Sequence, residues 1–466
     1  MDNDEVEPAS FRDVASTVFY RGGEVYRALS ASALADWTAM STTGFFSEAM
    51  ASGRIVGTEL ASIDAPPDAL GGSATAVLRH ERVPFVSYPY EWPFHMLKEG
   101  ALAHLDLLTD ALNAGVTMKD GYAYNVQFVG ARPVFIDVMS FEPATGGPWA
   151  GYRQFCQTFL FPLMLQAQKR VPFQPWLRGS LEGISPVHMR GFYRGRDVFR
   201  TGVLKHVMLH AAVEARFSDK GANDTKAEMD AAGFSNQLAL AAVRGIRKTV
   251  AKLEWKPKGS TWNDYRQTCT YTDADAEAKQ TFVRRALAAS RPSLVWDLGA
   301  NDGAYSRIAA ETADFVVATD LDDLVVDNLY GSLRSEGHEK ILPLVFNIAD
   351  PSPDLGWRAT ERRQLEARGR PDTVLALALI HHLVIGANLP MAGVIDWLAS
   401  VTDHLVIEFV DANDPQTKRL LANKPPERHR DYTVENFERL LADRFDIASQ
   451  ETLASSTRVL YDARRR

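Results

Sequence analysis

The second half of the chain alternates short apolar runs with longer amphipathic and polar stretches. Apolar runs occur at 294–297, 315–319, 341–346, 373–379 and 405–409, and two further runs follow at 445–448 and 458–461. A helix is expected between Tyr432 and Asp443, with Thr433 as its N-cap residue. Strands that alternate with helices are typical of a mostly parallel sheet. The pattern therefore predicts an α/β domain in this half of the chain.

Acidic and small residues follow the first two of these runs. The first run ends at Asp297 and enters a turn at Gly299, where glycine lets the backbone turn sharply and approach a ligand. The second run ends in Asp320, 21 residues beyond Gly299. Open α/β sheets bind ligands at the carboxyl ends of their strands. A dinucleotide-binding loop would need glycines where Asn301 and Ala304 stand.

This stretch resembles the cofactor loop of class I methyltransferases that use S-adenosylmethionine, with the pattern acid-x-Gly-x-Gly-x-Gly. Asp297, Gly299 and Gly303 match it, and Asn301 replaces the middle glycine. Asn tolerates a positive φ better than most residues. The resemblance implies a seven-stranded Rossmann-like methyltransferase sheet whose last two strands form an antiparallel edge. It also implies that Asp320 accepts both ribose hydroxyls and that Asp297 holds the methionine ammonium.

The same resemblance implies further cofactor contacts. The loop after the third run would cover the adenine, and a segment before the domain would fold over the cofactor. The residues at these positions, together with the neighbour of Asp320, are Tyr265, Tyr271, Leu321, Asn347 and Ile348. Lys279 is a further candidate for closing the site, and the alternative is that its helix simply packs on the sheet.

Candidate catalytic residues follow the fourth and fifth runs. Methyl transfer from a sulfonium needs alignment of the nucleophile, and a hydroxyl nucleophile also benefits from a general base. His381 and His382 lie where related enzymes face the transferred methyl group, and Glu408 is a second candidate. The alternatives are that a histidine packs at the strand end and that Glu408 is a buried acid paired to a basic partner. No metal is required.

The first half of the chain carries a different motif between residues 118 and 141. Asp120 is followed by four residues, Asn125, an apolar hairpin and Asp137. This resembles the catalytic loop of small-molecule kinase-like phosphotransferases, in which Asp120 would match the base and Asn125 and Asp137 the metal-holding pair. Met118 stands where the pattern has His, and no clear glycine-rich phosphate loop precedes it.

The kinase-like resemblance covers roughly residues 75–210 and lacks a full N-terminal lobe. It leaves three interpretations open: a degenerate module that binds substrate or braces the other domain, an active phosphotransferase, and a chance match on an unrelated α+β domain. The expected organisation is a kinase-like α+β domain over 1–215, a connector over 216–258 and the methyltransferase domain over 259–466.

Composition and charge limit the kinds of partner that the protein is expected to bind. A chain of 466 residues is too long for a single hydrophobic core. The formal net charge of −8 disfavours nonspecific nucleic-acid binding. Two cysteines build no disulfide framework, and the acidic N-terminus lacks a signal-peptide core. No apolar run is long enough to span a bilayer. These features predict a cytoplasmic protein with no membrane or nucleic-acid partner.

The whole chain resembles a family of bacterial two-part proteins in which a kinase-like region precedes a class I methyltransferase. The resemblance implies S-adenosylmethionine-dependent methylation of a small-molecule or glycan-like acceptor. The expectation that oxygen is methylated rests only on His381 and His382. The alternatives are a protein or tRNA methyltransferase, a non-catalytic nucleotide-binding scaffold and a bifunctional kinase–methyltransferase.

Overall fold

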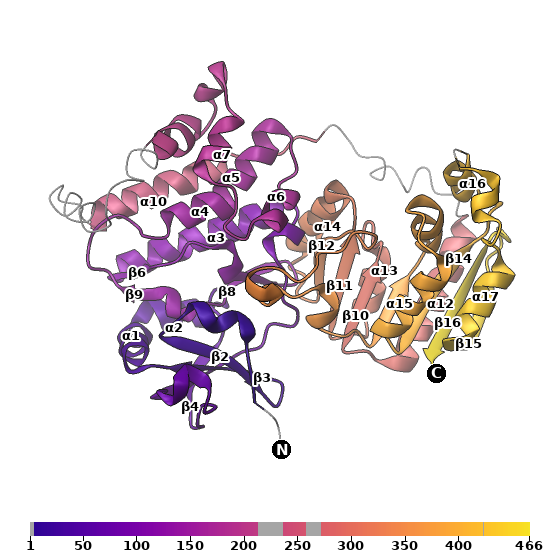
Figure 1. Cartoon of the computed structure of the whole chain (residues 1–466), viewed down its shortest axis with the longest axis horizontal. Helices are drawn as coiled ribbons and strands as arrows, with labels where there is room; N and C mark the ends of the chain where they lie inside the picture. Colours follow the sequence, from indigo (N-terminus) through magenta and orange to yellow (C-terminus); the bar gives the residue numbers. More distant parts are fainter. Residues whose placement is uncertain (1–3, 213–235, 258–271, 423) are drawn as a thin grey trace. The chain divides into compact units, whose positions relative to one another are not determined.

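The computed structural model describes residues 4–212, 236–257, 272–422 and 424–466 (Figure 1). The chain forms two compact units. The first unit comprises Met1–Phe128, Pro133–Pro257 and Asp354–Arg363. The second comprises Val129–Arg132, Lys258–Pro353 and Gln364–Arg466. Each unit is described by itself.

The second unit is built on a seven-stranded sheet with the order β12-β11-β10-β13-β14-β16-β15. Its strands are β10 (Leu294–Leu298), β11 (Phe315–Asp320), β12 (Ile341–Val345), β13 (Thr373–Ala376), β14 (His404–Val410), β15 (Phe445–Thr452) and β16 (Arg458–Arg465). Strands β10 to β14 are parallel, whereas β16 pairs antiparallel with both β14 and β15. The predicted seven-stranded sheet with an antiparallel edge is confirmed.

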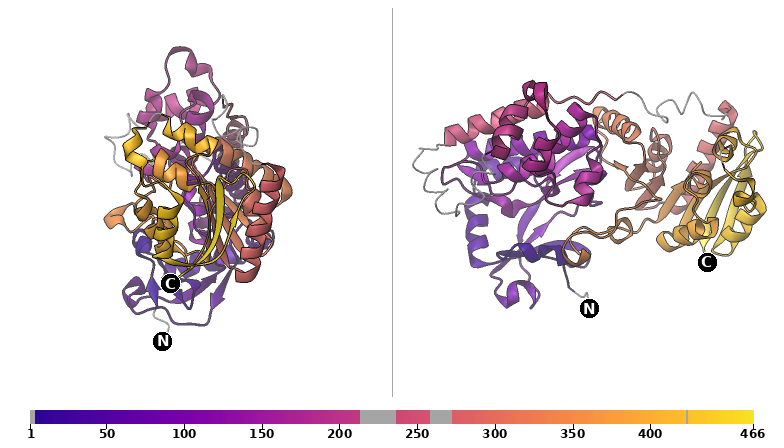
Figure 2. Two further views of the ribbon diagram at one scale, coloured as in Figure 1. Left: turned by 90° about the vertical axis from the view of Figure 1, so that its right-hand side faces the viewer. Right: turned by 45° about the horizontal axis from the view of Figure 1, so that its top comes forward.

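Helices lie against both faces of this sheet (Figure 2). They are α12 (Asp273–Ser290), α13 (Ala304–Ala310), α14 (Asp323–Glu336), α15 (Met391–Val401), α16 (Pro415–Leu421) and α17 (Val434–Ala442). Helix α17 begins where the sequence predicts, because the Thr433 side chain accepts a hydrogen bond from the backbone N–H of Asn436.

Strand β13 ends earlier than the apolar pattern predicts. The run continues to Leu379, but the strand stops at Ala376. Ala378 has a φ of +51°, a left-handed conformation that an extended strand cannot contain. The backbone therefore leaves the sheet two residues after the strand and turns toward the histidine pair at 381 and 382.

A five-stranded antiparallel sheet with the order β1-β2-β3-β5-β4 opens the first unit. Its strands are β1 (Glu5–Val6), β2 (Ser16–Arg21), β3 (Glu24–Leu29), β4 (Thr58–Ala61) and β5 (Ala76–His80), with α1 (Ala31–Ser41) and α2 (Gly44–Ala51) between β3 and β4. The sequence led us to expect no full lobe before residue 75. The structure instead places a five-stranded sheet and two helices within residues 5–80, which the sequence did not predict.

The rest of the first unit is mainly helical. Its elements are α3 (Phe94–Asn113), β6 (Val116–Met118), β7 (Val126–Val129), β8 (Arg132–Phe135), β9 (Phe141–Pro143), α4 (Tyr152–Phe155), α5 (Phe161–Met164), α6 (Gln174–Gly179), α7 (Pro186–Gly191) and α10 (Asn236–Ala251). The hairpin β7–β8 turns at Gly130, at a φ of +59°, as the motif predicts. Helix α10 lies in the predicted connector and contacts α3.

Aromatic rings surround a buried histidine in the core of the first unit. His104 of α3 is 1% exposed, and its ring lies 5.7 to 5.9 Å from those of Phe135, Trp149, Phe155 and Phe159. Among the described residues, neither ring nitrogen has a hydrogen-bond partner. Burial lowers the pKa of His104 to about 3.

Across the described helices, none is both long and apolar enough to cross a membrane.

We expect this histidine to make the first unit sensitive to acid. As the pH falls below the ordinary histidine pKa, the unfolded chain binds a proton that folded His104 excludes, so stability is lost. Between pH 7 and pH 5 the loss is about 2 kcal/mol by linkage. His104→Leu should remove this part of the pH dependence in urea unfolding followed by hydrogen exchange of α3. The exposed His188→Leu is the control, and an unchanged dependence in His104→Leu would contradict the assignment.

Candidate functional site

In the loop after β10, every second residue from 299 to 303 has a positive φ. The φ values are +78° at Gly299, +49° at Asn301 and +75° at Gly303. The prediction that Asn301 adopts a positive φ in place of a glycine is therefore confirmed. The backbone N–H groups of Gly299 and Ala300 both donate to the carbonyl of Thr319 on β11. These bonds fix the loop against the neighbouring strand.

Asp320 lies at the end of β11 and faces this loop. Its two carboxylate oxygens accept backbone hydrogen bonds, one from the N–H of Asn301 at 3.0 Å and one from that of Asp322 at 3.0 Å. Burial raises the pKa of the carboxyl group, and the backbone donors oppose this shift. Because each oxygen keeps a second lone pair, the carboxylate can still accept two hydroxyls from a ligand.

Asp297, at the end of β10, is buried beside the same loop. It is 2% exposed and accepts a hydrogen bond of 2.6 Å from the Ser306 hydroxyl. Burial raises the pKa of Asp297 to about 6, while Ser306 and the charge of Lys279 oppose the rise. A positively charged ligand group would favour the ionised carboxylate here.

The other predicted cofactor residues lie at neighbouring strand ends. Leu321 directly follows Asp320 and is 61% exposed, an unusual position for a large apolar side chain. Asn347 and Ile348 follow β12 and are half-buried, and Asn347 Oδ1 accepts from the backbone N–H of Ala349 at 3.0 Å. Tyr265 and Tyr271 lie outside the described residues.

Two adjacent imidazoles follow β13. The ring centroids of His381 and His382 are 4.1 Å apart. His381 is 1% exposed, and within the described part of the chain neither of its ring nitrogens has a hydrogen-bond partner. Burial places its pKa well below the ordinary value, and the charges of His382, Arg458 and Lys279 lower it further. Burial and Arg458 lower the pKa of His382 to about 4. Both rings are therefore neutral at neutral pH.

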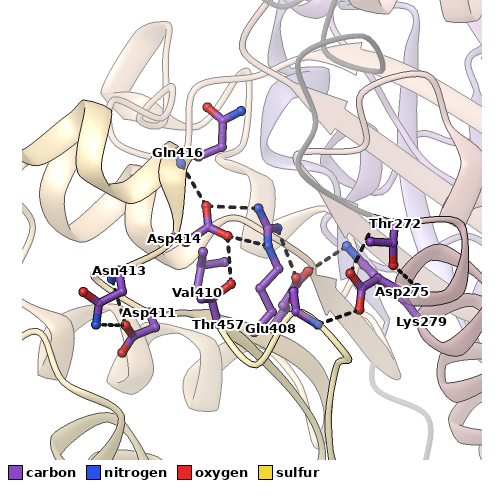
Figure 3. A network of polar contacts seen from close by, with 12 residues as sticks. Thr272, Asp275, Lys279, Glu408, Val410, Asp411, Asn413, Asp414, Gln416 and Thr457 are labelled. Carbon is purple, nitrogen blue, oxygen red and sulfur yellow. Dashed lines mark hydrogen bonds and ion pairs between the residues drawn. The ribbon is translucent and has the colours of Figure 1, made fainter.

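Glu408 of β14 is completely buried in an ion-pair network (Figure 3). Its carboxylate lies 2.6 Å from the Lys279 ammonium and 3.3 Å from the Arg458 guanidinium. Lys279 is 3% exposed at its side chain and also lies 4.6 Å from the centre of the Tyr305 ring. The alternative that the sequence left open for Glu408, a buried acid with a basic partner, describes this arrangement.

Arg458 was not identified from the sequence. It begins β16, and because β16 is antiparallel to β14 this start lies beside Val410 at the carboxyl end of β14. Its side chain is 1% exposed and bonds Asp414 at 2.9 Å as well as Glu408. No local motif marks such an arginine, since its partners are 44 and 50 residues away in the chain. The sequence signal is a charged residue that opens an apolar strand, and this strand lies between β14 and the edge strand β15.

The predicted motif residues of the first unit lie together. Asn125 Nδ2 is 3.5 Å from Asp137 Oδ2, and Asp120 accepts from the Gln154 side chain at 3.3 Å. Burial raises the pKa of Asp120, and the charge of Asp137 raises it further. Arg27 of β3, which the sequence did not single out, forms an ion pair of 3.2 Å with Asp137.

The strand order and the loop after β10 define the second unit as a methyltransferase-like fold. No family model matches the chain. The nodulation protein NoeA of Rhizobium meliloti (strain 1021) is 32% identical over 464 residues, which cover 97% of this chain and 94% of the relative. The chain belongs to the family of NoeA.

Three of the solved structures to which the chain is similar are methyltransferases of low sequence identity. The N-methyltransferase NodS of Bradyrhizobium japonicum WM9, with S-adenosylhomocysteine, is 13% identical over 44% of this chain and 99% of its own, with a TM-score of 0.32. Magnesium protoporphyrin IX methyltransferase of Synechocystis PCC 6803, with the same ligand, is 21% identical over 41% and 84%, at 0.30. The bifunctional kinase-methyltransferase WbdD is 17% identical over 41% and 40%, at 0.29.

The ion-pair network generates a prediction about stability. Lys279→Met leaves Glu408 buried with one cation, and breaking a buried pair in this way costs about 3–5 kcal/mol. Glu408→Gln should cost a similar amount, and the double variant less than the sum, because neither partner then remains charged alone. Urea dependence of hydrogen exchange in β10 and β14 measures the effect.

The matched control for this cycle is the exposed pair Arg284 and Glu311 of the same unit. Arg284→Met should change the stability by less than about 1 kcal/mol. Additive losses in Lys279→Met and Glu408→Gln would show that the two side chains do not act as a pair.

Proposed function

We propose that the protein transfers a methyl group from S-adenosylmethionine to a small-molecule or glycan-like acceptor, at an oxygen atom. The observation that carries the proposal is Asp320, whose carboxylate is fixed by two backbone N–H groups beside a loop with three positive φ values. Membership in the NoeA family supports an acceptor connected with nodulation.

The cofactor residues divide the ligand between them. Asp320 would accept the ribose hydroxyls, and the exposed Leu321 would cover an apolar face next to them. Asn347 and Ile348 would contact the adenine, and the buried Asp297 would pair with the methionine ammonium. The bound cofactor supplies a methyl group attached to a positively charged sulfur atom. The thioether that leaves when the methyl group is transferred is neutral. Gly299 would let the ligand approach the backbone closely, whereas the missing Cβ of Gly303 leaves room for the Leu329 side chain.

The histidine pair fits the role of a general base. A neutral imidazole can accept the proton of an acceptor hydroxyl, and His381 and His382 are both held neutral, although their lowered pKa values make them weaker bases than an ordinary histidine. Glu408 is less suited to that role because two cations already share its carboxylate. We therefore assign Glu408 to positioning, together with Lys279 and Arg458, and assign proton removal to the histidines.

We expect Asp320→Ala to abolish cofactor binding, since it removes the acceptor for the ribose hydroxyls. Calorimetric titration with S-adenosylhomocysteine should give micromolar binding in the native protein and a loss of at least about 2 kcal/mol, as for a charged hydrogen-bond acceptor, in the variant. Asp314→Ala, an exposed acid just before the opposite end of β11, is the control. Native affinity in Asp320→Ala would refute the assignment.

We expect His381→Ala or His382→Ala to lower turnover by about 10²–10⁴-fold without weakening S-adenosylhomocysteine binding. Transfer of labelled methyl groups to a panel of hydroxyl and amino acceptors, with products identified by mass spectrometry, measures this. With His382 as the base, the native rate should fall only as the pH drops toward about 4. Full activity in both variants, or a product methylated at nitrogen, would rule out this mechanism.

A further inference from the structure

A cluster of polar side chains in the first unit has the composition of a cation site. We call Asp120, Asn125, Asp137 and Ser140 the acidic cluster. Its two carboxylates influence one another, since the charge of Asp137 raises the pKa of Asp120. Carboxylate and amide oxygens are the ligands that Mg²⁺ and Mn²⁺ prefer. The kinase-like resemblance of the sequence implies a metal at Asn125 and Asp137.

The donors around Asp137 do not fit a metal ion. One carboxylate oxygen, Oδ1, is 3.2 Å from the Arg27 guanidinium. The other, Oδ2, accepts from the Ser140 hydroxyl at 2.7 Å and from the Asn125 amide nitrogen at 3.5 Å. Asn125 also donates to the Ser140 hydroxyl at 3.2 Å. The amide thus presents its nitrogen to the carboxylate, whereas a metal ligand presents oxygen.

Arg27 is held in place from its other side. Its NH1 donates to the Ser16 hydroxyl at 3.0 Å, and that hydroxyl donates to Asp13 at 2.5 Å. The Arg27 side chain is 13% exposed and the Asp137 side chain 25% exposed. A guanidinium fixed by the sheet loses little freedom on pairing, and a partly buried pair is screened less by salt than a surface pair.

We propose that Arg27 supplies from within the chain the positive charge that the acidic cluster would otherwise take from a divalent cation. The first unit therefore functions without a metal at this cluster. Magnesium-dependent phosphoryl transfer by this unit is not expected in its native form, because a metal at Asp137 would have to displace Arg27 from the carboxylate. Removal of the guanidinium should open a cation site at Asp137.

The experiment is a Mn²⁺ titration of the full-length chain, followed by electron paramagnetic resonance of the free ion. Asp137→Asn should leave Mn²⁺ binding by the otherwise native protein unchanged, because native Asp137 binds no Mn²⁺. Arg27→Gln should gain one Mn²⁺ per chain, at least about tenfold tighter than any site of the native protein, because the freed Asp137 carboxylate attracts a hard cation. Arg27→Gln combined with Asp137→Asn should lose the gain, and Arg27→Lys should show none.

Arg79→Gln on the adjacent strand β5 is the matched control. It also frees two carboxylates, those of Glu24 and Glu59, but outside the cluster, and should gain no site. Native Mn²⁺ binding that Asp137→Asn abolishes would overturn the proposal. So would a folded Arg27→Gln that gains nothing. If Arg27→Gln fails to fold, the comparison of native protein with Asp137→Asn still decides. Binding of S-adenosylhomocysteine is measured separately, so the outcome is independent of the second unit.

Discussion

The buried Glu408 carboxylate is the main electrostatic constraint at the carboxyl-terminal end of strand β14 in the second unit. A charge with no exposed surface needs partners within hydrogen-bond distance, and two cations supply them, Lys279 from α12 and Arg458 from β16. The requirement ties helix α12, which precedes the sheet, and the antiparallel strand β16 to strand β14. Burial and His382 disfavour protonation of His381, and the same two cations disfavour it further, so the network contributes to the state of the proposed base.

The two halves of the proposed site rest on different kinds of interaction. The cofactor side depends on backbone conformation: three positive φ values after β10 and two N–H groups on Asp320. The acceptor side depends on side-chain charges that come from separate strands and a helix. Backbone conformation is fixed locally and tolerates only a few residue types, whereas a charge network can be assembled from any elements that the fold brings together.

This difference explains how much could be predicted from the sequence. The seven strands, the turn at Gly299, the positive φ of Asn301 and the cap at Thr433 are local features, and the sequence predicted all of them. The pairing of Glu408 with Arg458 depends on the antiparallel register of β14 and β16, which no local pattern specifies. The early end of β13 was missed because the apolar run continues through Ala378. An alanine in the sequence gives no sign that its backbone is left-handed. Roles for the individual site residues stay predictions.

The first unit shows the same limit. The spacing of Asp120, Asn125 and Asp137 is local and was found, while Arg27 lies on a sheet that the sequence did not predict and reaches Asp137 only in the folded unit. With Asp137 paired to Arg27, we propose that the loop of Asp120, Asn125 and Asp137 needs no divalent cation. The alignment with NoeA covers 97% of this chain and therefore extends over both units.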